Sequence, residues 1–418
     1  MGATSDNLYA RISARLGAMI IAIIIGSGAS AALAQETVLP KGMKRVEGKY
    51  HYLMYDLSDD QAREAMLRME AMVDEYLDRT RDFSGRLGGG KLPFMLFRRE
   101  EDYHRAGGMP DTAGVFDGKQ LLAIAGEKLN AETWHTIQHE GFHQFAHAVM
   151  GGGMPIWVNE GLAEYFGEAV FTGDGFVSGA IPAYRLDRVR KSINGKQFKS
   201  IDAMLQLSHR EWNNEMSAMN YDQAWAMVAF LAHGDDGKYQ KAFGQFISQT
   251  GRGIPWENAW QATFGQRRGI EERMEAWWNS PQRDDAIEPY ARAATQMLSS
   301  YLARATSQKD KFADIKELLA GIKQGTIRHN PNDLLPKGLA NDCIELVAGL
   351  EQKRGVKFEL TAVPVGQSRT LTQPAIVCRV PDGTTITGTF KLRTGNRVGV
   401  VEAKIERPKP TPATKPSR

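Results

Sequence analysis

The chain has 418 residues, enough for two or three domains, and its 42% hydrophobic and 24% charged residues are ordinary for a globular protein. The formal net charge is only +3, and no basic stripe interleaved with aromatic residues appears, so we expect no nucleic-acid partner. Both cysteines, Cys343 and Cys378, lie late in the chain and form no metal-type C-x-x-C pair. A disulfide between them and two free buried thiols remain equally open.

The N-terminus predicts export. Arg11 and Arg15 precede the apolar run 18–25, and a small-residue segment follows that ends in an A-x-A cleavage pattern at Ala34. We therefore predict a signal peptide over residues 1–34 and a mature chain that is periplasmic or extracellular. The apolar run is shorter than the roughly 20 residues of a membrane span, and no later run is long enough, so no span is expected after signal removal. An uncleaved signal anchor is the alternative.

The next part of the chain reads as short strands alternating with helices. Apolar runs of four to eight residues indicate strands, and one long segment with apolar residues at helical spacing indicates an amphipathic helix. The predicted elements are strands at 50–55, 92–97, 114–116 and 119–125, and helices at 58–82 and 100–105.

The following segment carries the pentapeptide H-E-G-F-H at residues 139–143, an H-E-x-x-H pattern. Residues 131–150 favour a helix, because they contain no proline and a glycine run follows them. His139 and His143 then lie one turn apart on one helix face, where both imidazoles can reach a single Zn²⁺ at about 2.0–2.1 Å. Glu140 is placed to take a proton from a metal-bound water rather than to bind the metal.

A catalytic zinc ion needs a third protein ligand and an open position for water. Residues 155–166 read P-I-W-V-N-E-G-L-A-E-Y-F, in which Glu160 is the candidate ligand. His135 and His147 continue the four-residue spacing, but helical stripes drift, so we interpret both as ordinary polar or packing residues. The alternatives are a non-metal role for the histidine pair and a capping role for Glu160.

The W-x-N-E-G-x-A-E-Y-F string after H-E-x-x-H resembles the gluzincins, the superfamily of thermolysin and the aminopeptidase N-like enzymes. Over residues 90–235 the chain is also similar to uncharacterised bacterial exported proteins that have a peptidase-like domain of unknown function. The resemblance implies that Glu160 is the third zinc ligand beside His139 and His143. It also implies that Glu164 accepts a hydrogen bond from a liganding histidine, His139, and thereby fixes its tautomer. A solvent-facing helix acid is the alternative for Glu164.

Two further implications come from the same resemblance. Residues 220–228 resemble the helix start that carries the catalytic tyrosine of aminopeptidase N-like enzymes, so Tyr221 would donate to the oxyanion of the transition state. An aromatic that merely packs on Trp225 is an equal alternative. A strand pair before the H-E-x-x-H helix resembles the zincin layout, in which an edge strand pairs with extended substrate, and the candidate edge is Lys119–Ala125.

The rest of the chain is predicted to be helical first and β-rich later. Residues 182–301 read as mainly helical, most clearly at 217–233, and resemble the helical lower lobe of gluzincins. Further helices are expected at 312–323 and 338–353, and strands at 357–363, 374–379, 384–392 and 397–405. The predicted domains are a signal peptide (1–34), a gluzincin-like catalytic domain (35–301), a helical segment (302–354), a small β module (355–405) and a disordered tail (406–418).

The sequence thus predicts an α+β, zincin-like fold: a small mixed sheet with an active-site helix and a helical lower lobe, followed by a small β-rich C-terminal module. The predicted function is an exported zinc-dependent metallopeptidase that acts on a peptide or protein substrate. Two alternatives stay open, a catalytically quiet exported binding protein and a hydrolase of a cell-wall amide.

Overall fold

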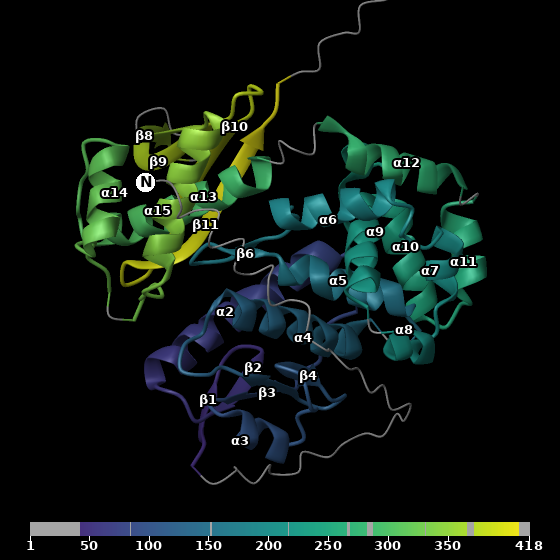
Figure 1. The fold of residues 1–418 in the computed structure, drawn as a ribbon. Helices are drawn as coiled ribbons and strands as arrows, with labels where there is room; N and C mark the ends of the chain where they lie inside the picture. The colour runs from purple at the N-terminus through teal and green to yellow at the C-terminus, as the bar shows by residue number, and fades with distance from the viewer. Residues whose placement is uncertain are drawn as a thin grey trace, which may run out of the picture. The chain divides into compact units, whose positions relative to one another are not determined.

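A computed structural model describes most of residues 42–408, in two compact units (Figure 1). The N-terminal unit comprises Met1–Ala169 and Ser178–Asp285, and the C-terminal unit comprises Val170–Val177 and Ala286–Arg418. The predicted signal peptide lies outside the described residues. Within the described part of the chain, no helix is both long enough and apolar enough to cross a membrane. The described residues are 42–83, 85–150, 153–215, 217–265, 268–281, 287–330, 332–365 and 372–408.

The N-terminal unit contains a five-stranded mixed sheet with the order β1-β2-β3-β5-β4. Strands β2, β3 and β5 run parallel, whereas β1 and β4 pair antiparallel at the two edges. The predicted strands at 92–97 and 114–116 are confirmed, and β1 was not predicted. The strands are β1 (Lys44–Glu47), β2 (His51–Tyr55), β3 (Leu92–Phe97), β4 (Gly114–Phe116) and β5 (Leu121–Ile124).

The prediction that Lys119–Ala125 forms the sheet edge is wrong. This segment contains β5, which pairs with β3 on one side and with β4 on the other. The turn through Gly118, whose φ is +88°, folds β4 back along β5 and leaves β4 as the outer strand. The strand that ends the sheet on this side is therefore β4.

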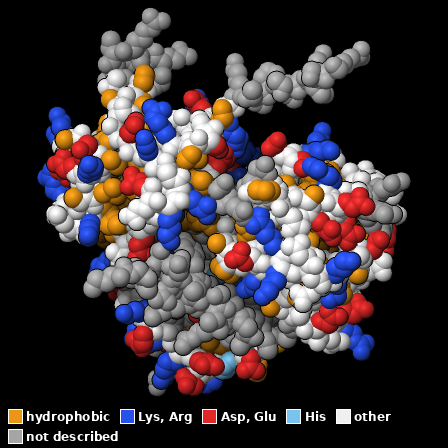
Figure 2. Space-filling model, turned by 45° about the horizontal axis from the view of Figure 1, so that its top comes forward, with side chains coloured by type: hydrophobic (Ala, Val, Ile, Leu, Met, Phe, Trp, Pro, Cys, Tyr) orange, Lys and Arg blue, Asp and Glu red, His pale blue; other side chains and the backbone are white. Residues whose placement is uncertain are grey.

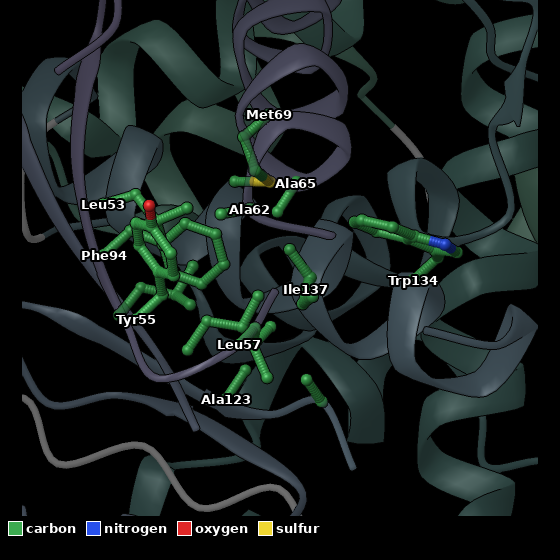
Figure 3. Close-up of a cluster of buried hydrophobic side chains, with 13 residues drawn as sticks. Leu53, Tyr55, Leu57, Ala62, Ala65, Met69, Phe94, Ala123, Trp134 and Ile137 are labelled. Carbon is green, nitrogen blue, oxygen red and sulfur yellow. The ribbon is translucent and has the colours of Figure 1, made fainter. Parts of the chain in front are cut away.

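Helices α2 (Asp59–Thr80) and α4 (Ala131–Val149) cover one face of the sheet, and α3 (Glu100–Arg105) covers the other. Side chains alternate between the faces, as expected for strands. Figure 3 shows apolar side chains of β2, β3 and β5 meeting those of α2 and α4. The buried residues of this cluster include Leu53, Phe94, Met69 and Ile137. Met54, Met95 and Leu122 point to the opposite face, where they meet Tyr103 of α3.

The remainder of the N-terminal unit is helical, apart from its loops, as predicted. Helix α5 packs between α4 and α9, and a buried row of aromatic side chains fills the interior around it. The helices are α5 (Ile156–Gly167), α6 (Ala183–Asn194), α7 (Ile201–Gln206), α8 (His209–Glu215), α9 (Ala218–Gly237), α10 (Gln240–Gly251), α11 (Trp256–Thr263) and α12 (Arg268–Asn279).

The C-terminal unit consists of a four-stranded antiparallel sheet, order β11-β10-β9-β8, and three helices. Helix α13 packs on β9, β10 and β11, and on the short hairpin β6–β7. Both cysteines are buried free thiols. The elements are β6 (Val170–Phe171), β7 (Phe176–Val177), α13 (Ile287–Ser307), α14 (Ile315–Gln324), α15 (Leu339–Arg354), β8 (Lys357–Pro364), β9 (Thr372–Arg379), β10 (Thr385–Arg393) and β11 (Arg397–Glu406).

The domain boundaries differ from those predicted. The boundary at 301/302 falls inside α13, which is one continuous helix and belongs to the C-terminal unit because its buried face packs on that unit's sheet. The predicted helical segment (302–354) and β module (355–405) are parts of this same unit. Arg304 of α13 forms ion pairs with Asp174 in the β6–β7 hairpin and with Asp333, which in turn accepts a hydrogen bond from the backbone N–H of Val398 in β11. The predicted tail begins too early, because Glu406 still pairs with β10; residues 409–418 lie outside the described residues.

Charged side chains of both signs are spread over the face that Figure 2 shows. Acidic and basic groups lie among one another there, which matches the small formal net charge of +3.

The close packing of α5 on α9 provides a test of the fold. A Cβ atom on Gly161 would lie 2.5 Å from the backbone oxygen of Ala224, so one helix must shift to admit it. We expect Gly161→Ala to lower the free energy of unfolding by about 1–3 kcal/mol. The matched control is Gly269→Ala on α12, where a Cβ meets nothing within 4 Å and the better helix propensity should stabilise slightly. Thermal unfolding of both variants measures the difference, and equal melting temperatures would contradict the packing.

Candidate metal centre

Helices α4 and α5 position the centre, and their relative placement is fixed by buried polar contacts. Asn130 caps α4, since its side chain accepts a hydrogen bond from the backbone N–H of Thr133 at 2.8 Å. Near the middle of α4, the Gln138 amide donates to the backbone oxygens of Phe166 and Gly167 at the end of α5. The Tyr76 hydroxyl of α2 donates to the Gln138 backbone oxygen at 2.6 Å. Three helices are thus tied together beside the H-E-x-x-H pentapeptide.

Three ligand atoms converge where α4 faces α5. His139 Nε2 and His143 Nε2 lie 3.0 Å apart, and Glu160 Oε2 lies 3.4 Å from the first and 3.6 Å from the second. All three side chains are buried, with exposed fractions of at most 2%. Two donor atoms that bind one tetrahedral zinc ion at 2.0–2.1 Å are separated by about 3.3 Å. The three observed separations lie around this value.

The hydrogen bonding of these atoms also fits a cation. Glu160 Oε2 has no hydrogen-bond partner among the described residues, although it is fully buried. The two histidine nitrogens approach this oxygen only to 3.4 and 3.6 Å, and a cation bound between the three atoms would satisfy it directly. His139, His143 and Glu160 therefore form a buried group able to hold a metal ion.

Glu164 lies on the far side of the His139 ring from Glu160. Its Oε1 is 3.1 Å from His139 Nδ1, and its side chain is 6% exposed, so it is not a solvent-facing acid. When Nδ1 carries the proton that faces Glu164, Nε2 keeps its lone pair for a metal ion. The structure thus brings Glu164 to the ring that the sequence assigned to it, while its effect on metal binding stays a prediction.

Glu140 is buried beside the ligands and faces the sheet edge. The backbone N–H of Phe116 in β4 donates to Glu140 Oε2 at 2.8 Å, and Oε1 has no hydrogen-bond partner among the described residues. Burial raises the pKa of Glu140, against the opposing charges of His143 and His139. A carboxylate with a raised pKa and one uncommitted oxygen is suited to accept and return a proton.

Tyr221, at the start of α9, lies next to the histidines. Its ring centroid is 6.4 Å from that of His139, and its ring meets Trp212 edge-on at 5.2 Å. Burial and the charge of Glu160 raise the pKa of Tyr221 far above its usual range, so the phenol stays protonated and can donate a hydrogen bond. Trp225, its predicted packing partner, contacts Arg185 and Trp278.

The sequence analysis missed Arg185 of α6, which reaches the same carboxylates. It pairs with Glu164, with Glu168 at 2.8 Å and with Asp222 at 3.2 Å, and its side chain is only 4% exposed. The spacing along α6 indicated that Arg185 is buried, because it lies four and eight residues before the apolar Val189 and Ile193 on the same helix face. The buried residues of α6 are Arg185, Leu186, Val189 and Ile193.

The two remaining histidines of α4 take different positions. His135 Nε2 lies 3.7 Å from Glu164 Oε2, and its Nδ1 lies 3.9 Å from Glu168 Oε1, so it faces the same carboxylates as Arg185. His147 is exposed and packs on the ring of Phe116 at 5.4 Å between centroids. His147 is thus a packing residue and His135 a polar one, which are the two roles predicted for these histidines.

Part of the chain is similar to a known protein family. Residues 133–257 match a family described as a protein of unknown function (DUF1570). The matched segment contains His139, Glu140, His143, Glu160 and Tyr221, and no curated protein matches the chain.

The electrostatics of the centre predict proton release when a metal binds. Burial lowers the pKa of His139, but Glu160 and Glu164 outweigh burial and raise it to about 10. The pKa of Glu160 is lowered to about 2, because the two histidines overcome the cost of burial. At pH 7 to 8 a metal ion must therefore displace a proton from His139, whereas Glu160 is already ionised.

We expect zinc binding at this pH to release about one proton, and zinc affinity to rise roughly tenfold per pH unit until about pH 10. Calorimetric titration of chelator-stripped protein in two buffers with different ionisation enthalpies counts the protons. A heat of binding that is independent of the buffer would contradict the expectation.

Proposed function

We propose that this chain is an exported, zinc-dependent metallopeptidase of the gluzincin type, with a zincin-like N-terminal unit. The observation that carries the proposal is the convergence of His139 Nε2, His143 Nε2 and Glu160 Oε2 within 3.6 Å of one another, next to the buried Glu140. Two imidazoles and one carboxylate are a ligand set that favours zinc, whereas Ca²⁺ and Mg²⁺ favour oxygen ligands alone. Three protein ligands leave a fourth position open, as catalytic zinc sites require.

The proposed reaction is hydrolysis of a peptide bond by water. Zinc bound at this centre supplies Lewis acidity, which lowers the pKa of a water molecule towards about 7 and polarises a carbonyl group. Glu140 takes the proton of the attacking water on Oε1, while the N–H of Phe116 holds Oε2 in place. The same carboxyl group then gives that proton to the nitrogen of the leaving amine. The phenol of Tyr221 donates a hydrogen bond to the carbonyl oxygen as negative charge develops on it.

The position of β4 at the edge of its sheet favours a peptide as the substrate. It is the last strand of its sheet, and its Phe116 N–H bonds directly to the proposed base. An extended peptide that paired with this edge would carry its backbone past Glu140. We therefore assign substrate pairing to β4. Export is part of the proposal and rests on the signal peptide that the sequence predicts over residues 1–34.

Replacement of the proposed base separates catalysis from metal binding. Glu140→Gln keeps the size of the side chain but cannot accept the proton, so we expect full zinc content with hydrolysis reduced by about 10²–10⁴-fold. The matched control is Glu132→Gln in the first turn of the same helix, which should leave the rate unchanged. Cleavage of a broad peptide library, with zinc content from metal analysis, measures both.

Two outcomes would contradict the proposal. A Glu140→Gln protein that cleaves as fast as the wild type would remove Glu140 from the mechanism. A wild-type protein that holds zinc but cleaves neither the library nor a cell-wall amide would favour the catalytically quiet binding protein instead.

A second substitution decides between the two roles of Tyr221. Tyr221→Phe removes the hydroxyl and keeps the ring that packs on Trp212. If the phenol donates to the oxyanion, kcat should fall by about 10²–10³-fold while KM and the melting temperature hardly change. Steady-state kinetics measures both constants, and an unchanged kcat would show that the residue only packs.

A further inference from the structure

Arg185 is the only described residue whose guanidinium bonds to three buried carboxylates beside the centre. Nη2 bonds to Glu164 Oε2, Nη1 lies 2.8 Å from Glu168 Oε1, and Nε lies 3.2 Å from Asp222 Oδ1. The guanidinium also lies over the ring of Trp225, with its carbon 4.8 Å from the ring centroid. All three nitrogens and one face of the guanidinium plane are therefore engaged, which restricts its position.

The Arg185 guanidinium lies next to a second group of possible metal ligands. His135, His139 and Glu164 also bring ligand atoms within 4.8 Å of one another. However, Glu164 Oε2 already bonds to Arg185, so the positive charge at this place comes from the protein itself. The group is thus an ion-pair network attached to the first centre rather than a second one.

We propose that Arg185 is a positioning residue for the metal centre, which acts on His139 through Glu164. This inference rests on the metal binding in the proposed function. Glu164 Oε1 lies 3.1 Å from His139 Nδ1 and Oε2 bonds to Arg185, so Arg185 holds the carboxylate at the end that faces away from the ring. The terminal torsion of a glutamate is otherwise broad, and the contact to the imidazole would be kept only part of the time. A ring that is free to turn loses the direction of its Nε2 lone pair.

The charge of Arg185 serves the same purpose. Glu164, Glu168 and Asp222 have side chains that are at most 11% exposed, and three carboxylates this close together repel one another when all are ionised. Arg185 places one positive charge among these carboxylates and bonds to all three, which offsets their repulsion and lets Glu164 stay next to His139.

The experiment compares zinc affinities, measured by competition with a chromophoric chelator on chelator-stripped full-length protein. Arg185→Lys keeps the buried positive charge but replaces the planar fork by one nitrogen, which cannot hold three carboxylates at once. We expect it to bind zinc about 10–100-fold more weakly than the wild type. The matched control is Arg188→Lys, because Arg188 pairs with the same Asp222 but is 36% exposed and, among the described residues, makes no ion pair with Glu164. It should bind zinc like the wild type.

A double variant tests the route through Glu164. If Arg185 acts through this carboxylate, Glu164→Gln with Arg185→Lys should bind zinc no more weakly than the weaker single variant. Wild-type affinity in Arg185→Lys, an equal loss in Arg188→Lys, or multiplied losses in the double variant would each overturn the inference. Should Arg185→Lys fail to fold, Asp222→Asn loosens the same guanidinium from its other side, and unchanged zinc affinity in that variant would overturn it instead.

The readout involves no substrate, so the two proposals fail in different ways. If the wild-type protein binds zinc but cleaves no peptide, the proposed peptidase activity is contradicted. The zinc affinities of the variants then still test the role of Arg185. If the wild-type protein binds no zinc, the proposed metal centre is contradicted, and the inference about Arg185 fails with it.

Discussion

The imidazole of His139, held between two carboxylates of one helix, is the constraint on which the centre depends. Glu160 faces its Nε2 at 3.4 Å and Glu164 faces its Nδ1 at 3.1 Å. These acids are one helical turn apart on α5. Both can contact the ring only if α5 packs closely on α4 with one position along the helix axis. The Gln138 amide of α4 donates to the backbone at the end of α5 and holds these two helices together. On the other side of α5, the lack of a side chain at Gly161 lets α9 pack closely.

The electrostatics divide the buried acids into two sets. Glu140 and Glu160 face the side where the three donor atoms converge, whereas Glu164, Glu168 and Asp222 face Arg185. The His139 ring contacts both sets, since Glu160 faces its Nε2 and Glu164 faces its Nδ1. A protein cation therefore balances one side permanently, and the other side keeps an acid, Glu160 Oε2, without a partner among the described residues.

The sequence predicted those features that depend on local pattern. Helices at the pentapeptide and at α9, strand β3 and the four C-terminal strands follow from apolar spacing, and the residues of the candidate centre follow from two short motifs. Strand order did not follow, because pairing of β5 with β3 and β4 is set by contacts distant in sequence. Arg185 was missed for the same reason: its three partners come from α5 and α9. The predicted domain boundary at 301/302 is wrong because it divides α13, which is one continuous helix. The unit to which α13 belongs is decided by the sheet on which it packs, and a local sequence pattern does not contain that information.

The claim that three side chains of α4 and α5 share one metal ion has a direct test. Crystals of the full chain, grown with zinc and measured on both sides of the zinc absorption edge, give an anomalous difference map that locates the ion independently of any assay. The account predicts one strong peak within about 2.0–2.2 Å of His139 Nε2, His143 Nε2 and a Glu160 oxygen. A zinc-loaded crystal with no peak there, or with Glu160 turned away from the ion, would contradict it.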